Sequence, residues 1–262
     1  MNCLLKMRAQ RDQMSVNERK LADFILDNIE LLRDYSSQQL ADAVGVSQSS
    51  VVKFSQKLGY RGYPSLKLAV YESYAGSMMA QAGDDSARHF SGGDSPLSQL
   101  GQKKFEILEN TTSINEADQI TAAIAAIRAA RCIQVSACPG SVAVARYLTH
   151  QLLECGRWAI FDEGGKLQSP IARTLEDDDL LFIVCDLGGE ESLVDVVNRA
   201  REQGARVLSI TRYNYNAASI HSDIRLYVAP AEGDEGWQRI LFRAAQMHLI
   251  EGLIGGLINQ EG

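Results

Sequence analysis

The chain has 262 residues and a formal net charge of −7 at pH 7, with 45% hydrophobic and 23% charged residues. This length is long for one ordinary domain and suits two, and the composition is that of a globular protein. The acidity excludes a chain that binds polyanions over its whole surface. No apolar run approaches the roughly 18 residues that cross a bilayer, and the first residues show no signal peptide, so we expect no membrane partner.

The five cysteines are scattered, odd in number and without a C-x-x-C pair: Cys3, Cys132, Cys138, Cys155 and Cys185. This pattern argues against a zinc site and against a disulfide framework. We therefore expect a cytoplasmic protein with no bound metal and no cofactor, in which the cysteines act as small buried hydrophobic residues.

The stretch Ser36–Tyr60, SSQQLADAVGVSQSSVVKFSQKLGY, predicts two helices joined by a tight turn. Ser36 or Ser37 can cap the first helix, and Gly45 supplies the positive φ that the turn needs. Ser47 can cap the second helix. Small and apolar residues also recur where two crossing helices would touch. This combination is typical of a helix-turn-helix.

One predicted helix on either side completes a small all-helical unit over residues 1–75. Apolar residues at helical spacing predict these helices at about Asn17–Leu32 and Tyr63–Tyr74. Residues 1–75 hold 10 Lys and Arg against 8 Asp and Glu, whereas the remainder holds 16 against 25. Any contact with nucleic acid is therefore expected to be local to this unit.

The second helix of the pair is predicted to turn a polar face outward, because Val51 and Phe54 point to the core at 100° per residue. The residues on and beside that face that suit base edges are Gln48, Ser49, Ser50, Val52 and Gln56. The residues that suit phosphates are Ser37, Lys53, Lys57 and Arg61. This set predicts a helix that binds double-stranded DNA.

Residues 76–98 are rich in Gly, Ser and Asp and are interpreted as a linker. Residues 99–262 then alternate short apolar runs with helical patterns, and a last helix is expected from Trp237 to Ile258. The runs are Cys132–Ala137, Trp158–Phe161, Leu180–Cys185, Val207–Thr211 and Ile224–Val228. The third run is continuously hydrophobic, as in a strand buried on both faces of a parallel sheet. The pattern predicts a doubly wound α/β domain.

The N-terminal residues from SSQQLADAVGVSQSSVVKFSQKLGYRGYPSLK, preceded by ERKLADFIL, resemble the head of RpiR-type bacterial transcription regulators. The resemblance implies two domains: an all-α helix-turn-helix head, and a sugar isomerase (SIS) domain with a doubly wound parallel sheet. It further implies a homodimer or tetramer that binds a palindromic operator, with the SIS domain sensing a phosphosugar. We therefore expect a regulator of a carbohydrate-related pathway.

The two ligand loops of the SIS domain differ here from the family pattern. The first reads ACPGSVAVA, where Ser141 and Ala145 match but Pro139 replaces a glycine. The second reads CDLGGE, where only Gly188 matches and three hydroxyl residues are lost. Carboxylates at the second loop would repel a phosphate dianion.

Three interpretations of the SIS domain remain open. The effector is a different molecule at the carboxyl ends of the strands, or a phosphosugar is held from shifted positions, or the domain only mediates dimerisation. The candidate effector-binding residues are Ser136, Ser141, Asp186, Gly188, Glu190 and Ser192.

An isomerase built on the SIS fold is the alternative function from another class. It needs a base near the sugar carbons and a group that opens the ring. His221 is the best histidine for this chemistry, with Glu163 or Glu191 as base. We expect no enzyme activity, because an isomerase has no use for a DNA-reading helix. A third possibility is a DNA-binding scaffold without any ligand response. The sequence does not distinguish it from a ligand-responsive regulator, because both share the same N-terminal unit.

Overall fold

The structure of the chain is a computed structural model that describes residues 3–11, 14–29, 31–33, 35–82, 95–186, 191–213, 216–231 and 233–259. The chain divides into two compact units, Met1–Gln102 and Lys103–Gly262. Within the described residues, no helix is both long and apolar enough to span a membrane.

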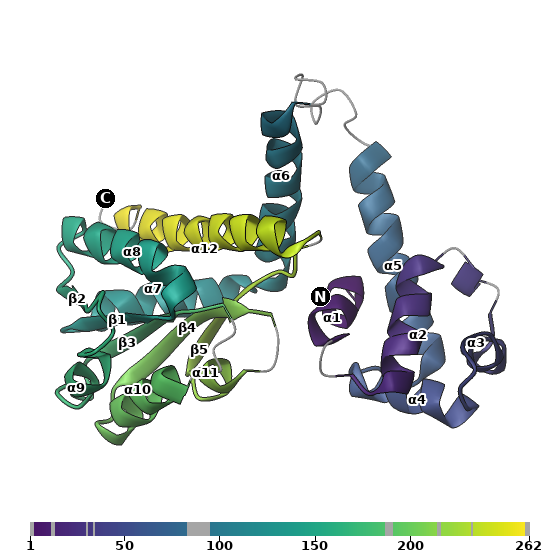
Figure 1. Cartoon of the computed structure of the whole chain (residues 1–262), viewed down its shortest axis with the longest axis horizontal. Helices are drawn as coiled ribbons and strands as arrows, with labels where there is room; N and C mark the ends of the chain where they lie inside the picture. The colour runs from purple at the N-terminus through teal and green to yellow at the C-terminus, as the bar shows by residue number, and fades with distance from the viewer. Residues whose placement is uncertain are drawn as a thin grey trace. The chain divides into compact units, whose positions relative to one another are not determined.

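The N-terminal unit packs short helices around one hydrophobic core (Figure 1). The helices are α1 (Cys3–Gln10), α2 (Val16–Asp27), α3 (Ser37–Val44), α4 (Gln48–Lys57) and α5 (Tyr63–Ala82), with a short 3-10 helix at Leu31–Arg33. The predicted helix-turn-helix is confirmed as α3 and α4.

Two predicted helix ends are wrong in this unit. The helix expected to reach Leu32 ends at Asp27. The side chain of the next residue, Asn28, donates a hydrogen bond to the carbonyl of Phe24 and so interrupts the helical pattern of backbone hydrogen bonds. The helix expected to end at Tyr74 continues to Ala82, into the segment interpreted as a linker. Residues 75–82 include Ala, Met and Gln, whose helix propensity outweighs the local Gly and Ser.

The C-terminal unit is built on a five-stranded parallel sheet of order β2-β1-β3-β4-β5. The strands are β1 (Ile133–Ala137), β2 (Ala159–Phe161), β3 (Leu180–Val184), β4 (Arg206–Arg212) and β5 (Ile224–Val228). Each lies within one residue of its predicted bounds, and the doubly wound architecture is confirmed. Both β1 and β3 are buried along their whole length, as their hydrophobic sequences predict.

Helices cover both faces of this sheet (Figure 1). They are α7 (Ala117–Ala129), α8 (Val142–Glu154), α9 (Gln168–Ala172), α10 (Glu191–Glu202), α11 (Ala217–Ile220) and α12 (Glu235–Ile258), and α6 (Pro96–Ile114) precedes them in the chain. One face carries α7, α8 and α12, and the other carries α9, α10 and α11. In the chain, β1 is followed by α8 on one face of the sheet, and β3 is followed by α10 on the other. The neighbouring strands β1 and β3 therefore form a switch point of the sheet. A crevice at such a switch point is where doubly wound sheets bind ligands.

The glycine in the turn between α3 and α4 provides a test of stability. Gly45 has a φ of 73°, which residues with a Cβ rarely adopt. Gly45→Ala is expected to lower the free energy of unfolding of the N-terminal unit by about 1 kcal/mol, and Gly45→Asn by less, because asparagine tolerates this conformation better. Denaturant unfolding measures both.

Gly62→Ala is the matched control in the same unit. Gly62 has no left-handed φ, and an added Cβ would meet only Pro64 Cδ at 3.9 Å. A Gly45→Ala variant as stable as Gly62→Ala would show that the turn does not depend on positive φ.

Candidate nucleic-acid interface and effector site

The helix α4 is held in place by one buried apolar face. Val51, Phe54 and Leu58 are almost fully buried in a core that includes Leu21 of α2 and Leu40 of α3. Burial of each such side chain contributes roughly 1.5–3 kcal/mol. Because a helix turns 100° per residue, this burial fixes the opposite face of α4 toward solvent.

Both helices of the pair begin at a serine cap. Ser36 Oγ accepts from the Gln39 N–H, and the Gln39 side chain accepts from the Ser36 N–H. Ser47 Oγ accepts from the N–H of Ser50 at the start of α4. The sequence does not decide whether Ser36 or Ser37 caps the first helix of the pair. The structure places the cap at Ser36 and makes Ser37 the first residue of α3.

The outward face of α4 carries most of the residues predicted to read bases. Gln48, Ser49, Val52 and Gln56 are exposed, and even apolar Val52 keeps 36% of its surface exposed. Ser47 Oγ lies 2.9 Å from Ser49 Oγ and 2.8 Å from Ser50 Oγ, and Ser50 differs from Ser49 in being half-buried. Ser50 thus belongs to the cap of α4 in this structure, and its contact with a base stays a prediction.

The basic residues predicted to contact phosphates differ in whether their charge is already paired within the unit. Lys53 and Arg61 are exposed, as residues that meet phosphates must be. Lys57 is exposed as well, but its Nζ lies 2.8 Å from Oε2 of Glu18 in α2. Burial raises the pKa of Glu18, but hydrogen bonds from Lys57 and Ser15 outweigh it and hold that pKa below its usual value. The Lys57 ammonium therefore already has an anionic partner.

The half-buried Ser37 contacts the first residue of α4. The Gln48 Nε2 donates a hydrogen bond to Ser37 Oγ at 2.9 Å. The sequence places both residues in the interface but gives no sign that their side chains meet.

Two serines predicted to hold an effector are buried and already hydrogen-bonded. Ser136 Oγ, on β1, accepts from the amide of Gln134 at 3.1 Å. Ser141 Oγ lies 3.1 and 3.2 Å from the two amide atoms of Gln246 in α12. These hydroxyls are engaged inside the domain, which disfavours the expected role of either as an effector contact.

Asp186, at the carboxyl end of β3, is paired with a cation that sequence reasoning missed. Arg212, the last residue of β4, donates from Nε to Oδ1 at 2.7 Å and from Nη2 to Oδ2 at 2.9 Å. Both side chains are partly exposed, and the guanidinium lies 5.4 Å from the Phe242 ring centroid. This bidentate pair neutralises one of the carboxylates expected to repel a phosphate.

The remaining candidate effector residues divide between described and undescribed positions. Ser192 is exposed in the first turn of α10, beside Glu191 and at the same carboxyl edge of the sheet. Gly188 and Glu190 lie outside the described residues.

The structure does not bring together the residues considered for isomerase catalysis. Glu163 follows β2 and pairs with Arg146, and Glu191 follows β3, so both lie at the carboxyl edge of the sheet. His221 precedes β5 and therefore lies at the opposite, amino edge. Within one copy of the chain, His221 and the two glutamates therefore lie at opposite edges of the sheet.

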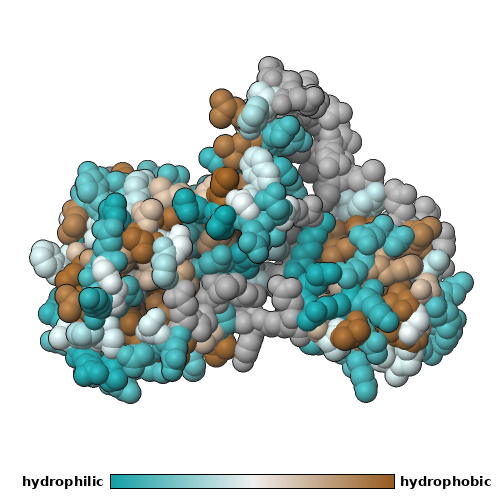
Figure 2. All heavy atoms as spheres, in the orientation of Figure 1, coloured by the Kyte–Doolittle hydropathy of each residue, from teal (hydrophilic) through white to brown (hydrophobic). Residues whose placement is uncertain are grey.

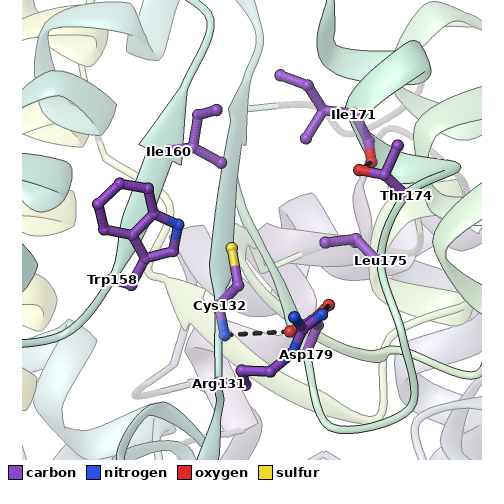
Figure 3. Close-up of a pocket in the computed structure, with 8 residues that line it drawn as sticks. All are labelled: Arg131, Cys132, Trp158, Ile160, Ile171, Thr174, Leu175 and Asp179. Carbon is purple, nitrogen blue, oxygen red and sulfur yellow. Dashed lines mark hydrogen bonds and ion pairs between the residues drawn. The ribbon is translucent and has the colours of Figure 1, made fainter.

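A cavity of about 480 Å³ opens at the amino edge of the first three strands (Figure 3). It is lined by Arg131, Cys132, Trp158, Ile160, Ile171, Thr174, Leu175 and Asp179. The Asp179 carboxylate accepts from Arg131 and from the N–H groups of Cys132 and Glu176. Burial and this carboxylate raise the pKa of the Cys132 thiol. The polar groups here hold the strand starts together, and none of the predicted effector residues lines the cavity.

The buried contact between Ser141 and Gln246 can be tested by a double-mutant cycle. Gln246→Leu leaves the Ser141 hydroxyl buried without its amide partner and is expected to cost about 1–3 kcal/mol of unfolding free energy. Adding Ser141→Ala should recover part of that loss, because both ends then become apolar. Denaturant unfolding of the C-terminal unit measures the cycle, and strictly additive losses would contradict the contact.

Family comparisons match both units. A family model described as a helix-turn-helix domain of the rpiR family matches residues 1–77, and a SIS domain model matches residues 126–253. The uncharacterized HTH-type transcriptional regulator YfhH of Escherichia coli (strain K12) is 32% identical over 267 residues, covering 100% of this chain and 93% of the relative.

Solved structures share the fold at lower identity. The Vibrio vulnificus NanR protein complexed with ManNAc-6P has a TM-score of 0.59 at 22% identity, covering 99% of this chain and 92% of its own. The sugar isomerase domain of an RpiR transcription factor from Sphaerobacter thermophilus has a TM-score of 0.57 at 22% identity, covering 62% of this chain and 89% of its own. At these identities the likeness shows the fold alone.

Proposed function

Because this chain belongs to the rpiR family of helix-turn-helix transcriptional regulators with a SIS domain, we propose that it binds a DNA operator through α4 in a complex of two or more copies. We further propose that its SIS domain takes a small anionic effector and catalyses no reaction. The DNA partner implies that the protein acts in the bacterial cytoplasm.

The observation that carries the DNA-binding proposal is the exposed polar face of α4. Gln48, Ser49 and Gln56 present hydrogen-bonding groups there, and Val52 presents a methyl-rich surface that suits thymine. Lys53 stands on the same helix and suits a phosphate. The core contacts of α4 are made by the opposite face, so this exposed face can meet a partner.

A homodimer or tetramer follows from how little one helix can read. A single helix contacts only a few base pairs, whereas two heads joined in one complex make the second contact intramolecular. Exposed apolar residues on α6 support this proposal, since Leu97 is 80% exposed and Phe105 is 47% exposed. Brown spheres gather along this helix in Figure 2. The long helix α12, in contrast, buries Leu241, Leu249 and Leu253 within its own unit.

The proposed effector site lies at the carboxyl edge of the sheet, beside Asp186 and Arg212. An anionic group can replace Asp186 on the Arg212 guanidinium, which matches phosphate and carboxylate geometry. Exposed Ser192 at the start of α10 can add a hydroxyl contact. A sugar phosphate fits this chemistry, and the NanR relative with ManNAc-6P supports the choice of class.

The proposal of a regulator without isomerase activity rests on the separation of the catalytic candidates. His221 lies at the amino edge of the sheet, away from Glu163 and Glu191. Incubation with aldose and ketose phosphates is expected to give no interconversion above the buffer rate. Turnover by the purified chain would contradict this part of the proposal.

Two lysines one turn apart on α4 test the DNA-binding proposal. Lys53→Ala is expected to weaken binding to all sequences and to lower the slope of log affinity against log salt by about 1. Lys57→Ala removes the same charge but should change the slope less, because its ammonium pairs with Glu18. Fluorescence anisotropy across a salt series measures both, and equal slopes for wild type and Lys53→Ala would contradict the assignment.

A substitution at the carboxyl edge tests the effector site. Arg212→Gln should lower affinity for sugar phosphates by about tenfold or more and leave DNA affinity without effector unchanged. Arg199→Gln is the matched control, because Arg199 pairs with Asp195 within α10. Calorimetric titration with a panel of sugar phosphates is the measurement. Unchanged binding in Arg212→Gln would place the effector elsewhere.

A further inference from the structure

One side-chain contact joins the two helices of the DNA-binding motif at their first residues. Gln48 is the first residue of α4, and its Nε2 donates to the Oγ of Ser37, the first residue of α3, at 2.9 Å. Both residues are partly or fully open to solvent at this point. The contact therefore lies on the surface that the proposed function assigns to DNA.

Neither side chain is needed to cap its own helix. The cap of α3 is made by Ser36 with Gln39, and the cap of α4 is made by Ser47 with the N–H of Ser50. The Ser37–Gln48 hydrogen bond is additional to the contacts that cap the two helices. The capping of α3 and α4 therefore does not explain it.

The direction of this hydrogen bond decides what Gln48 offers to a base. A glutamine amide has two N–H donors and one carbonyl acceptor. With one N–H given to Ser37, the amide presents one N–H and its carbonyl oxygen outward. That pair matches N7 and the N6 amino group of adenine in the major groove.

The Ser37 hydroxyl has its own proton left to donate, because its oxygen is the acceptor in this contact. A DNA phosphate oxygen only accepts hydrogen bonds. On the basis of the proposed function, we propose that Ser37 is a positioning residue: it donates to a phosphate and so keeps its oxygen as acceptor for Gln48. The phosphate contact thereby fixes the Gln48 amide for adenine.

The opposite direction predicts a different base. If the Ser37 hydroxyl donated to Gln48 Oε1, the amide would present two N–H groups outward. Two donors match the N7 and O6 acceptors of guanine. The phosphate contact therefore separates adenine from guanine at one position of each half-site, although phosphates carry no sequence information themselves.

Operator duplexes with adenine or guanine at each half-site position test this inference at fixed salt. The full-length chain is expected to prefer adenine at one position by about tenfold or more. Ser37→Ala should reduce that preference to within about twofold, and Ser37→Thr should retain it. Gln48→Ala should abolish it, and the double variant should lose no more than Gln48→Ala alone.

Gln38→Ala is the matched control, because Gln38 lies next to Ser37 but bonds to Asp42 within α3. Its adenine preference should equal that of wild type. A general loss of stability would lower all affinities together, whereas the inference predicts a change in the ratio between two bases.

A change in the DNA alone provides a second measurement on the unaltered protein. Replacing the contacted phosphate by a neutral methylphosphonate should lower the adenine preference as Ser37→Ala does. A guanine preference in wild type, or an adenine preference that survives Ser37→Ala, would overturn the inference while leaving DNA binding intact. Absence of any sequence preference in wild type would instead overturn the proposed function.

Discussion

Burial of the apolar face of α4 is the constraint on which the proposed DNA-binding surface depends. Val51, Phe54 and Leu58 occupy the core of the N-terminal unit, and the helical period then leaves Gln48, Val52 and Gln56 no inward position. The left-handed turn at Gly45 and the serine caps set the angle between α3 and α4. A change in that angle would move every predicted base contact at once, so the proposed recognition of DNA depends on the fold of this small unit.

The C-terminal unit keeps the parallel sheet of the fold, while the residues at the carboxyl ends of its strands differ from the family pattern. The strand order keeps the switch point between β1 and β3, but Ser141 beside it is engaged by Gln246. The ion pair of Asp186 with Arg212 introduces a guanidinium at that edge. An anionic ligand at this edge could thus be bound by an arginine in place of hydroxyl and backbone groups. Arginine binds anions in a defined geometry. A ligand can change the proposed DNA binding only if it has different affinities for two arrangements of the DNA-binding units.

The sequence predicts the helices, strands and tight turns of this structure, because these depend on residues close together in the chain. Helical spacing and the glycine at Gly45 locate the helix-turn-helix, and five apolar runs locate the strands to within one residue. The contacts that tune the sites are not predicted, because periodicity reports which side faces the core and not which distant side chain lies opposite. Gln246 is 105 positions from Ser141, and Glu18 is 39 from Lys57. The extension of α5 to Ala82 was missed because Gly and Ser concealed a helix-forming composition.

The most direct test of the account is selection of genomic DNA fragments by the purified full-length chain, followed by sequencing of the bound fragments. If α4 reads bases from a two-fold pair of heads, the fragments will share an inverted repeat whose half-sites lie about one helical turn apart. A chain that enriches no sequence, or only fragments of high general affinity without a repeat, would contradict the central claim that the outward face of α4 recognises an operator.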